Sequence, residues 1–158
     1  GVWGWWAQLR AGGVKVSNGW SDAYYKDFTK NGGTRPMVVS YLTSPAAEVF
    51  YSDNPVDTSP TANLNLAGGV YVQIEGAALL AGGKQAAAAE QFLAFLRSAP
   101  VQTALQTEMW MWPVQQGVAR VDVMRHSGEQ PSAVAIDQAV LDQQSRAWIR
   151  QFTQTVLR

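Results

Sequence analysis

The sequence predicts an α/β protein in which a mixed or parallel sheet is flanked by helices. Three short runs rich in β-forming residues are typical of buried strands, and they cover residues 14–17, 37–40 and 70–80. Each run is followed by turn residues and then by a helical pattern, over residues 21–30, 44–50 and 84–97. A chain that alternates strand and helix in this way favours the α/β class.

The first strand-to-helix turn carries a tryptophan. Residues 14–17 are expected to form a strand, and Trp20 lies in the turn that follows it. The helix begins near Ser21 and ends at Gly32, because glycine readily adopts the backbone conformation that closes a helix.

The second turn carries a tyrosine. Tyr41 directly follows the apolar run, Thr43 or Ser44 is a suitable helix cap, and Pro45 fits the first helical turn. In open α/β sheets, ligands bind at the carboxyl ends of strands. Trp20 and Tyr41 are therefore predicted either to line a ligand site at this edge or to close the ends of the hydrophobic core.

The rest of the chain divides into helices and loops. A helix ends at Gly12-Gly13, and residues 52–69 form a long polar loop. Ser98 caps a helix that runs from Pro100 to about residue 107. An aromatic loop, an irregular polar segment and a final helix are expected over residues 109–114, 115–133 and 134–157.

Composition excludes several classes of protein. The 158 residues are enough for one ordinary domain, and the 12 basic residues balance the 12 acidic ones. This balance predicts neither a nucleic-acid surface nor a polybasic membrane patch. The chain has no cysteine and no apolar run long enough to span a membrane. It shows no signal peptide, so we expect a mature or truncated product if the protein is exported.

Catalytic and metal-binding motifs are absent from the sequence. His126, the only histidine, is expected to be a solvated loop residue, and with no cysteine it predicts no zinc site. Glu75 lacks a second acid for acid/base catalysis. Neither a nucleophile elbow nor a phosphate-binding loop is present. We therefore predict no enzyme, no resident cofactor and no metal site.

Tyr24 and Tyr25 leave one metal hypothesis open. Phenolate oxygens bind ferric iron, and bacterial ferric-ion-binding proteins use an adjacent tyrosine pair. Side chains of neighbouring residues on a helix point about 100° apart, however. The alternative is that one ring is packed and the other is exposed.

Several stretches together resemble the thiamine-binding subfamily of periplasmic solute-binding proteins, the soluble receptors of bacterial ABC importers. They are G-W-S-D-A-Y at 19–24, V-V-S-Y-L-T-S-P-A at 38–46, V-Q-I-E at 72–75, W-M-W-P-V at 110–114 and R-A-W-I at 146–149. The resemblance runs in order over nearly the whole chain.

The resemblance implies the C-terminal part of a two-lobed, type II periplasmic-binding-protein fold, with the N-terminal half of that fold absent. Residues 1–67 would belong to the second lobe, residues 68–114 would cross back to the first lobe, and residues 115–158 would return to the second. The ligand would be clamped between the lobes.

The resemblance also implies an aromatic cage for thiamine or thiamine phosphate. Trp20, Tyr41 and Trp110 match its walls, and Trp112 stands where a tyrosine is common. Aromatic faces attract a permanently charged thiazolium ring without needing a carboxylate. Ser21 and Ser44 begin helices whose free N–H groups suit a hydroxyl or phosphate tail.

One position departs from the family pattern. Members often carry a further aromatic residue six positions after the tyrosine, where this chain has Ala47. The predicted function is thus a periplasmic or extracytoplasmic receptor that delivers thiamine to the membrane permease of an ABC importer. The alternatives are a related receptor for ferric iron or another small cationic solute, and an enzyme on the same fold that acts on the thiamine pyrimidine.

Overall fold

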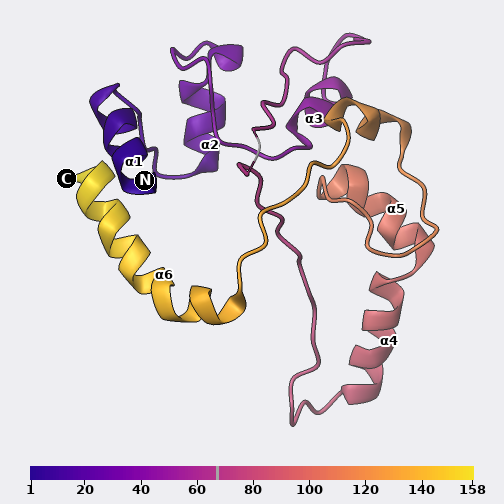
Figure 1. The fold of residues 1–158 in the computed structure, drawn as a ribbon. Helices are drawn as coiled ribbons and strands as arrows, with labels where there is room; N and C mark the ends of the chain where they lie inside the picture. The colour runs from indigo at the N-terminus through magenta and orange to yellow at the C-terminus, as the bar shows by residue number, and fades with distance from the viewer. Residues whose placement is uncertain (67) are drawn as a thin grey trace. The chain divides into compact units, whose positions relative to one another are not determined.

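The structure is a computed structural model that describes residues 1–66 and 68–158 (Figure 1). Its α-helices are α1 (Val2–Ala11), α2 (Trp20–Asp22), α3 (Ser44–Phe50), α4 (Ala86–Leu96), α5 (Ala99–Glu108) and α6 (Gln138–Phe152). Two π-helical turns, η1 (Ala23–Asp27) and η4 (Thr153–Leu157), extend α2 and α6. Two 3-10 helices are η2 (Thr29–Asn31) and η3 (Asp122–Ser127).

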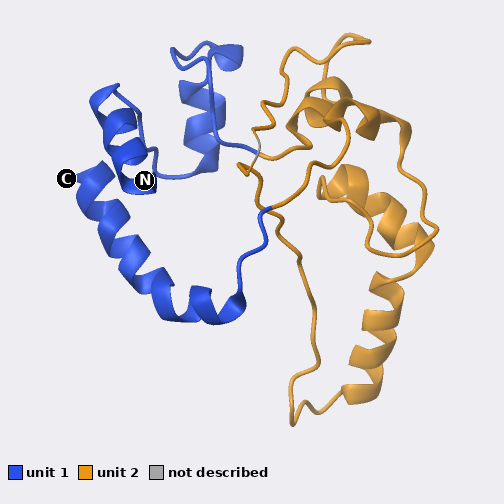
Figure 2. Cartoon of the chain, viewed as in Figure 1, with its two compact units in different colours: residues 1–40, 134–158 blue, residues 41–133 orange. Residues whose placement is uncertain are grey.

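The chain forms two compact units (Figure 2). Unit 1 combines Gly1–Ser40 with Val134–Arg158, and unit 2 comprises Tyr41–Ala133. The lobe boundaries expected from the sequence stay predictions. The first of them falls at residue 67, which lies outside the described residues.

The predicted mixed or parallel sheet is wrong for this structure. Within residues 1–66 and 68–158 there is no β-strand, and the β-bridge between Phe28 and Arg35 stands isolated. The segments expected as strands, residues 14–17, 37–40 and 70–80, run as irregular chain. The physical reason is that a strand exists only beside a neighbour whose N–H and C=O groups complete its ladder. Among the described residues, none pairs with these segments in a ladder.

The helices follow their local signals closely. α3 has the predicted bounds, with Pro45 in its first turn, and Ser98 is the N-cap residue of α5. The last helix was expected from residue 134, but α6 begins at Gln138. Asp137 sets this start, because its carboxylate accepts a 2.7 Å hydrogen bond from the backbone N–H of Ala139.

Unit 1 is held together by contacts between its two ends. The rings of Trp6 in α1 and Phe152 in α6 meet edge to face at 4.9 Å. Val156 is fully buried, and its carbonyl accepts a 2.6 Å hydrogen bond from the Arg10 guanidinium. Of the apolar residues predicted to share one side of the final helix, Phe152 and Val156 at its C-terminal end pack against the rest of unit 1.

Unit 2 is built where α3 packs against η3. Ala46 and Met124 are both fully buried there. The Asn63 side-chain amide donates to the carbonyls of Leu42, at 2.8 Å, and Ser127, at 3.1 Å. Asn63 therefore fixes the chain just before α3 to the end of η3.

Two buried glutamines of α5 hold the segment after the aromatic loop. The side-chain oxygen of Gln102 accepts from the N–H of Val114 at 2.9 Å. One turn further along the helix, Gln106 accepts from Val121 N–H at 2.9 Å and donates to the Ala119 carbonyl at 3.0 Å. These amides give an irregular backbone the partners that a strand would otherwise supply.

Large apolar side chains remain exposed in both units. The rings of Phe92 and Phe95, on the predicted apolar side of α4, are 57% and 58% exposed, and Ile149 of α6 is 66% exposed. The apolar sides predicted for these two helices are therefore left partly uncovered by the described residues.

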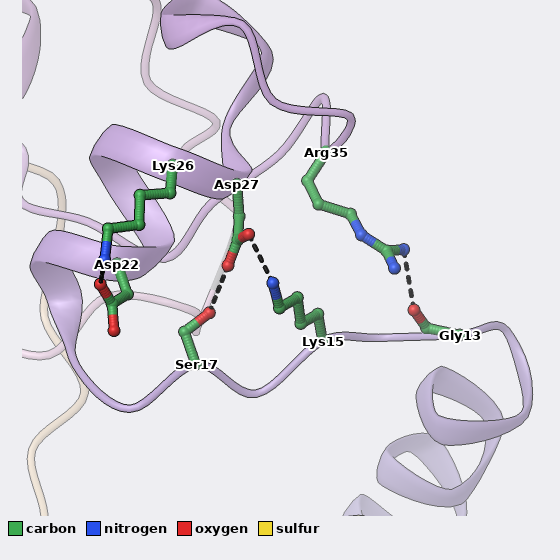
Figure 3. Close-up of polar contacts among 7 residues, drawn as sticks. All are labelled: Gly13, Lys15, Ser17, Asp22, Lys26, Asp27 and Arg35. Carbon is green, nitrogen blue, oxygen red and sulfur yellow. Dashed lines mark hydrogen bonds and ion pairs between the residues drawn. The ribbon is translucent and has the colours of Figure 1, made fainter.

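A polar cluster secures the turn that carries Trp20 (Figure 3). Asp27 accepts from Lys15 at 2.5 Å and from the Ser17 hydroxyl at 2.7 Å. The Arg35 guanidinium donates to the Gly13 carbonyl at 2.8 Å. Lys26 pairs with Asp22 at 2.5 Å on the neighbouring helical turn. These bonds connect residues on both sides of the turn.

The hydrogen bond from Lys15, together with that from Ser17, holds the pKa of the Asp27 carboxyl below its ordinary value of 3.8. A lowered carboxyl pKa stabilises the folded protein above the unfolded-state pKa, and this contribution is lost as the pH falls through the folded-state value. We predict that Asp27→Asn lowers the urea midpoint at neutral pH. The difference from the wild type should shrink as the pH falls below 3.8 and through the lower folded-state pKa, because the wild-type carboxyl then becomes protonated in both states.

Asp57→Asn is the matched control, because Asp57 lies exposed in the loop 52–66. It should leave the urea midpoint close to that of the wild type. Equal midpoints for Asp27→Asn and the wild type at neutral pH would show that the Lys15–Asp27–Ser17 contacts do not stabilise unit 1.

Candidate functional site

Trp20 begins α2 in unit 1 and lies on a platform of aromatic rings. Its ring stacks on that of Tyr24 at 4.9 Å with an interplanar angle of 23°. Its indole N–H donates to the Ser40 hydroxyl at 2.9 Å. One ring face is thus supported and the orientation of the ring is fixed, while the side chain keeps partial exposure.

Tyr41 and Ser44 lie at the entry to α3 in unit 2. The Tyr41 side chain is 62% exposed, so much of its ring surface faces away from the unit's interior. Ser44 is the first residue of α3. The turn between them is closed by a 3.0 Å hydrogen bond from Ser44 N–H to the Tyr41 carbonyl. The structure therefore presents Tyr41 as an exposed ring at a fixed turn.

Trp110 lies against the same helix and has a strained backbone. Its φ angle is 55°, in the left-handed region that bulky residues rarely occupy. Its carbonyl accepts a 2.9 Å hydrogen bond from the hydroxyl of Thr43, which is only 7% exposed. Strain of this kind costs about 1 to 3 kcal/mol and is concentrated at functional sites. Tyr41 and Trp110 are thus joined through the first turn of α3.

Two rings at the end of α3 were not predicted from the sequence. Phe50 and Tyr51 meet the Trp110 ring at centroid distances of 5.5 and 5.6 Å, both edge to face. The aromatic pair F-Y at the end of a predicted helix was the available signal. Its contact with a tryptophan about 60 residues away depends on tertiary structure. We call Phe50, Tyr51 and Trp110 the aromatic corner.

Trp112 has a different environment from Trp110. The guanidinium of Arg120 lies 4.7 Å from the centroid of the Trp112 ring, in a cation–π arrangement. Arg120 also lies 3.7 Å from the Glu129 carboxylate. One face of Trp112 is therefore already covered by a cation of the same chain.

The serines at the two helix starts offer little to an anion. Ser21 lies inside the three-residue α2, next to Asp22, whose negative charge opposes a phosphate group. Ser44 begins a helix of only seven residues. The acidic neighbour of Ser21 and the shortness of α3 leave the rings as the stronger recognition elements at both turns.

Tyr24 and Tyr25 differ in burial, as the alternative to the iron hypothesis predicts, although their rings meet edge to face at 5.4 Å. Tyr24 is 3% exposed beneath Trp20, whereas Tyr25 is 57% exposed. The part of the chain that the structure describes holds no group of three or more His, Cys, Asp or Glu placed to bind a metal ion. None of its helices has the length and apolar character required to span a membrane.

His126 is not in an open loop as expected, because it lies in η3 and is half-buried. It borders a cavity of about 370 Å³ that Asn63 and Ser127 also line. The hydroxyl of Ser127 is buried, and neither it nor the His126 Nε2 atom has a protein hydrogen-bond partner. The cavity contains none of the predicted site residues.

The Thr43 hydroxyl is predicted to hold the Trp110 backbone in place. Thr43→Val keeps the shape of the side chain but removes the hydroxyl, and it should destabilise the protein by about 1 kcal/mol. Thr43→Ser, which keeps the hydroxyl, should be closer to the wild type. Urea unfolding measures the stability, and near-ultraviolet circular dichroism reports the packing of the tryptophans.

Thr107→Val is the control, because the Thr107 hydroxyl makes only a long 3.5 Å contact with the Ala104 carbonyl. If Thr43→Val and Thr43→Ser unfold at the same urea concentration, the hydrogen bond to Trp110 contributes nothing measurable.

Comparison with known proteins was made on the whole chain. No protein-family model matches it, and no solved structure gives a significant match. It is 34% identical over 153 residues to a thiamine-binding periplasmic protein of Salmonella typhimurium and 33% identical over 153 residues to one of Escherichia coli. Both alignments cover 97% of this chain and 44% of the relative. A thiamine-binding periplasmic protein of Brucella melitensis is 37% identical over 108 residues, which is 68% of this chain and 30% of that protein.

The chain thus spans less than half the length of these curated relatives. The matches nevertheless extend over nearly all of its own residues, and they agree with the resemblance carried by the sequence motifs. The chain belongs to the thiamine-binding periplasmic protein family.

Proposed function

We propose that this chain is part of the solute-binding component of a bacterial ABC importer and that it contributes aromatic walls to a thiamine site. Trp20, Tyr41 and Trp110 are the rings that we assign to the ligand. The observation that carries the proposal is the Trp110 side chain, whose backbone is held in a strained conformation beside the exposed rings of α3. The names of the relatives support the choice of ligand.

The chemistry of the rings suits a permanent cation. Thiamine carries its charge on a thiazolium ring that cannot lose it by deprotonation. Each aromatic face attracts such a cation by about 0.5 to 2 kcal/mol, and most strongly where water is excluded. A site made of rings also avoids burying a carboxylate, which would be costly when the ligand is absent.

The structure favours thiamine over its phosphates. Asp22 places a negative charge beside Ser21, and Ser44 begins a helix of only seven residues, so neither serine suits a phosphate group well. We therefore assign the two serines to the hydroxyl tail of thiamine. Trp112 is assigned a supporting position next to Trp110, because Arg120 covers one of its faces.

Export and delivery follow from the same assignment. The relatives are periplasmic proteins. We place this protein outside the cytoplasmic membrane and propose a membrane permease as its partner. A nucleic-acid partner is not proposed, because the basic and acidic residues balance at 12 each.

Binding without catalysis fits the named relatives, which are binding proteins. The ferric-iron alternative gains no support from the geometry, because Tyr24 is packed beneath Trp20. An enzyme acting on the thiamine pyrimidine would require a nucleophile, and the chain has no cysteine to supply a thiolate.

Removing a wall of the site should weaken thiamine binding. Tyr41→Ala and Trp110→Ala, made in the complete mature protein, should each raise the dissociation constant at least fivefold, or about 1 kcal/mol. The measurement is a thiamine titration followed by tryptophan fluorescence and confirmed by calorimetry. Quenching should be large, because Trp20 and Trp110 would contact the ligand.

Tyr71→Ala is the matched control, since Tyr71 is 68% exposed and Tyr41 is 62% exposed. It should leave the affinity unchanged. Wild-type affinity in both Tyr41→Ala and Trp110→Ala would refute the aromatic assignment, and a wild-type protein that is folded and free of ligand yet does not respond to thiamine would refute the proposed function.

A further inference from the structure

Tyr51 is the most exposed ring of the aromatic corner. Its side chain is 66% exposed, whereas Phe50 is 50% exposed. The Tyr51 and Trp110 rings lie 5.6 Å apart at an interplanar angle of 66°. Two large rings at this angle leave part of each face open. An exposed ring that packs against a half-buried tryptophan is typical of a recognition surface rather than of core packing.

The position of Tyr51 on α3 brings it to the same side as Ala47. The backbone N–H of Tyr51 donates to the Ala47 carbonyl at 3.0 Å, so the helical bonding continues through Tyr51. Residues four apart on a helix lie one above the other on one face. Ala47 is half-buried and has a side chain of a single methyl group, so it adds little bulk on the side of the helix where Tyr51 lies.

The backbone at both ends of this contact is fixed. Trp110 is held by the Thr43 hydroxyl, which donates to its carbonyl at 2.9 Å. Phe50 contacts Tyr51 edge to face at 5.1 Å and braces it from the side of the helix. A site of this kind binds with little loss of side-chain freedom, because its rings are ordered before the ligand arrives.

We propose that Tyr51 is a further ligand-binding residue. With Trp110 it forms a corner that binds the cationic ring of a ligand with two flat rings. This inference rests on the proposed function, which supplies thiamine as the ligand. Tyr41 and Tyr51 stand at opposite ends of a helix that is about 10 Å long. A ligand with two rings joined through one carbon can contact both tyrosines. Tyr51 then faces the thiazolium.

The structure also indicates which property of Tyr51 matters. If the ring attracts the cation through its electron-rich face, then a side chain of similar shape without that face should not keep the affinity for thiamine. Tyr51→Phe should keep thiamine affinity within about twofold of the wild type, because phenylalanine retains a negative face. Tyr51→Leu keeps apolar bulk without the face, and it should weaken binding by about three- to thirtyfold.

A fluorinated side chain separates this effect from packing. Trifluorophenylalanine, introduced at position 51 by nonsense suppression in the complete mature protein, has nearly the shape of phenylalanine but a much weaker negative face. Its thiamine affinity should fall toward that of Tyr51→Leu. Urea midpoints close to that of Tyr51→Phe would show that the fold is unchanged. Tyr71→Leu controls for the loss of an exposed tyrosine elsewhere in unit 2.

The outcomes distinguish the two proposals. Loss of affinity in the leucine and fluorinated variants, with affinity kept in Tyr51→Phe, supports the assignment. Wild-type affinity for thiamine in all three variants, together with weaker binding in Tyr41→Ala, overturns the role of Tyr51 and leaves the proposed function standing. Equal losses in the phenylalanine and fluorinated variants overturn the contact between the ring face and the cation, because the phenol group would then be acting instead. A wild-type protein that does not bind thiamine overturns both proposals.

Discussion

Side-chain amides organise the part of the molecule that presents Trp110. Gln102 and Gln106 accept the N–H groups of Val114 and Val121, and Asn63 joins the entry of α3 to the end of η3. Each of these bonds satisfies backbone that has no strand or helix to bond with. A hydrogen bond of this kind contributes about 0.5 to 1.5 kcal/mol, and these three residues together set the course of the irregular segments.

The aromatic corner depends on that arrangement. Gln102 fixes the chain just after the aromatic loop, and Thr43 holds the Trp110 carbonyl inside it. Trp110, with its strained φ angle, is therefore held at its own carbonyl, and the chain is held again four residues later at Val114. The strain of about 1 to 3 kcal/mol persists because several bonds determine the same position. In unit 1, Trp20 is fixed in a comparable way by stacking on Tyr24 and by the Ser40 hydroxyl.

Local sequence signals predicted the helices, but the sheet that they also predicted is wrong for this structure. Pro45 in the first turn of α3 and Ser98 before α5 act within a few residues, so their effect can be read from the sequence. A strand requires a partner elsewhere, and the runs at 14–17, 37–40 and 70–80 find none in the described chain. Contacts between residues that are distant in the sequence also limited the prediction of the candidate site. Tyr41 was predicted from its turn, whereas Phe50 and Tyr51 gain their interest only through a contact with distant Trp110.

The magnitudes show what rings can and cannot do for a thiamine receptor. In the proposed site, Trp20, Tyr41 and Trp110 would together supply about 1.5 to 6 kcal/mol of cation–π attraction. A micromolar dissociation constant requires about 8 kcal/mol, even before the costs of association are included. The difference must come from removing the apolar surface of both ligand rings from water, at about 25 cal/mol per Å². Each further ring that closes over the ligand therefore adds twice, once through its electron-rich face and once through the water that it excludes. By this reasoning, the Tyr51 ring that we propose beside Trp110 would contribute more to binding than its own cation–π energy.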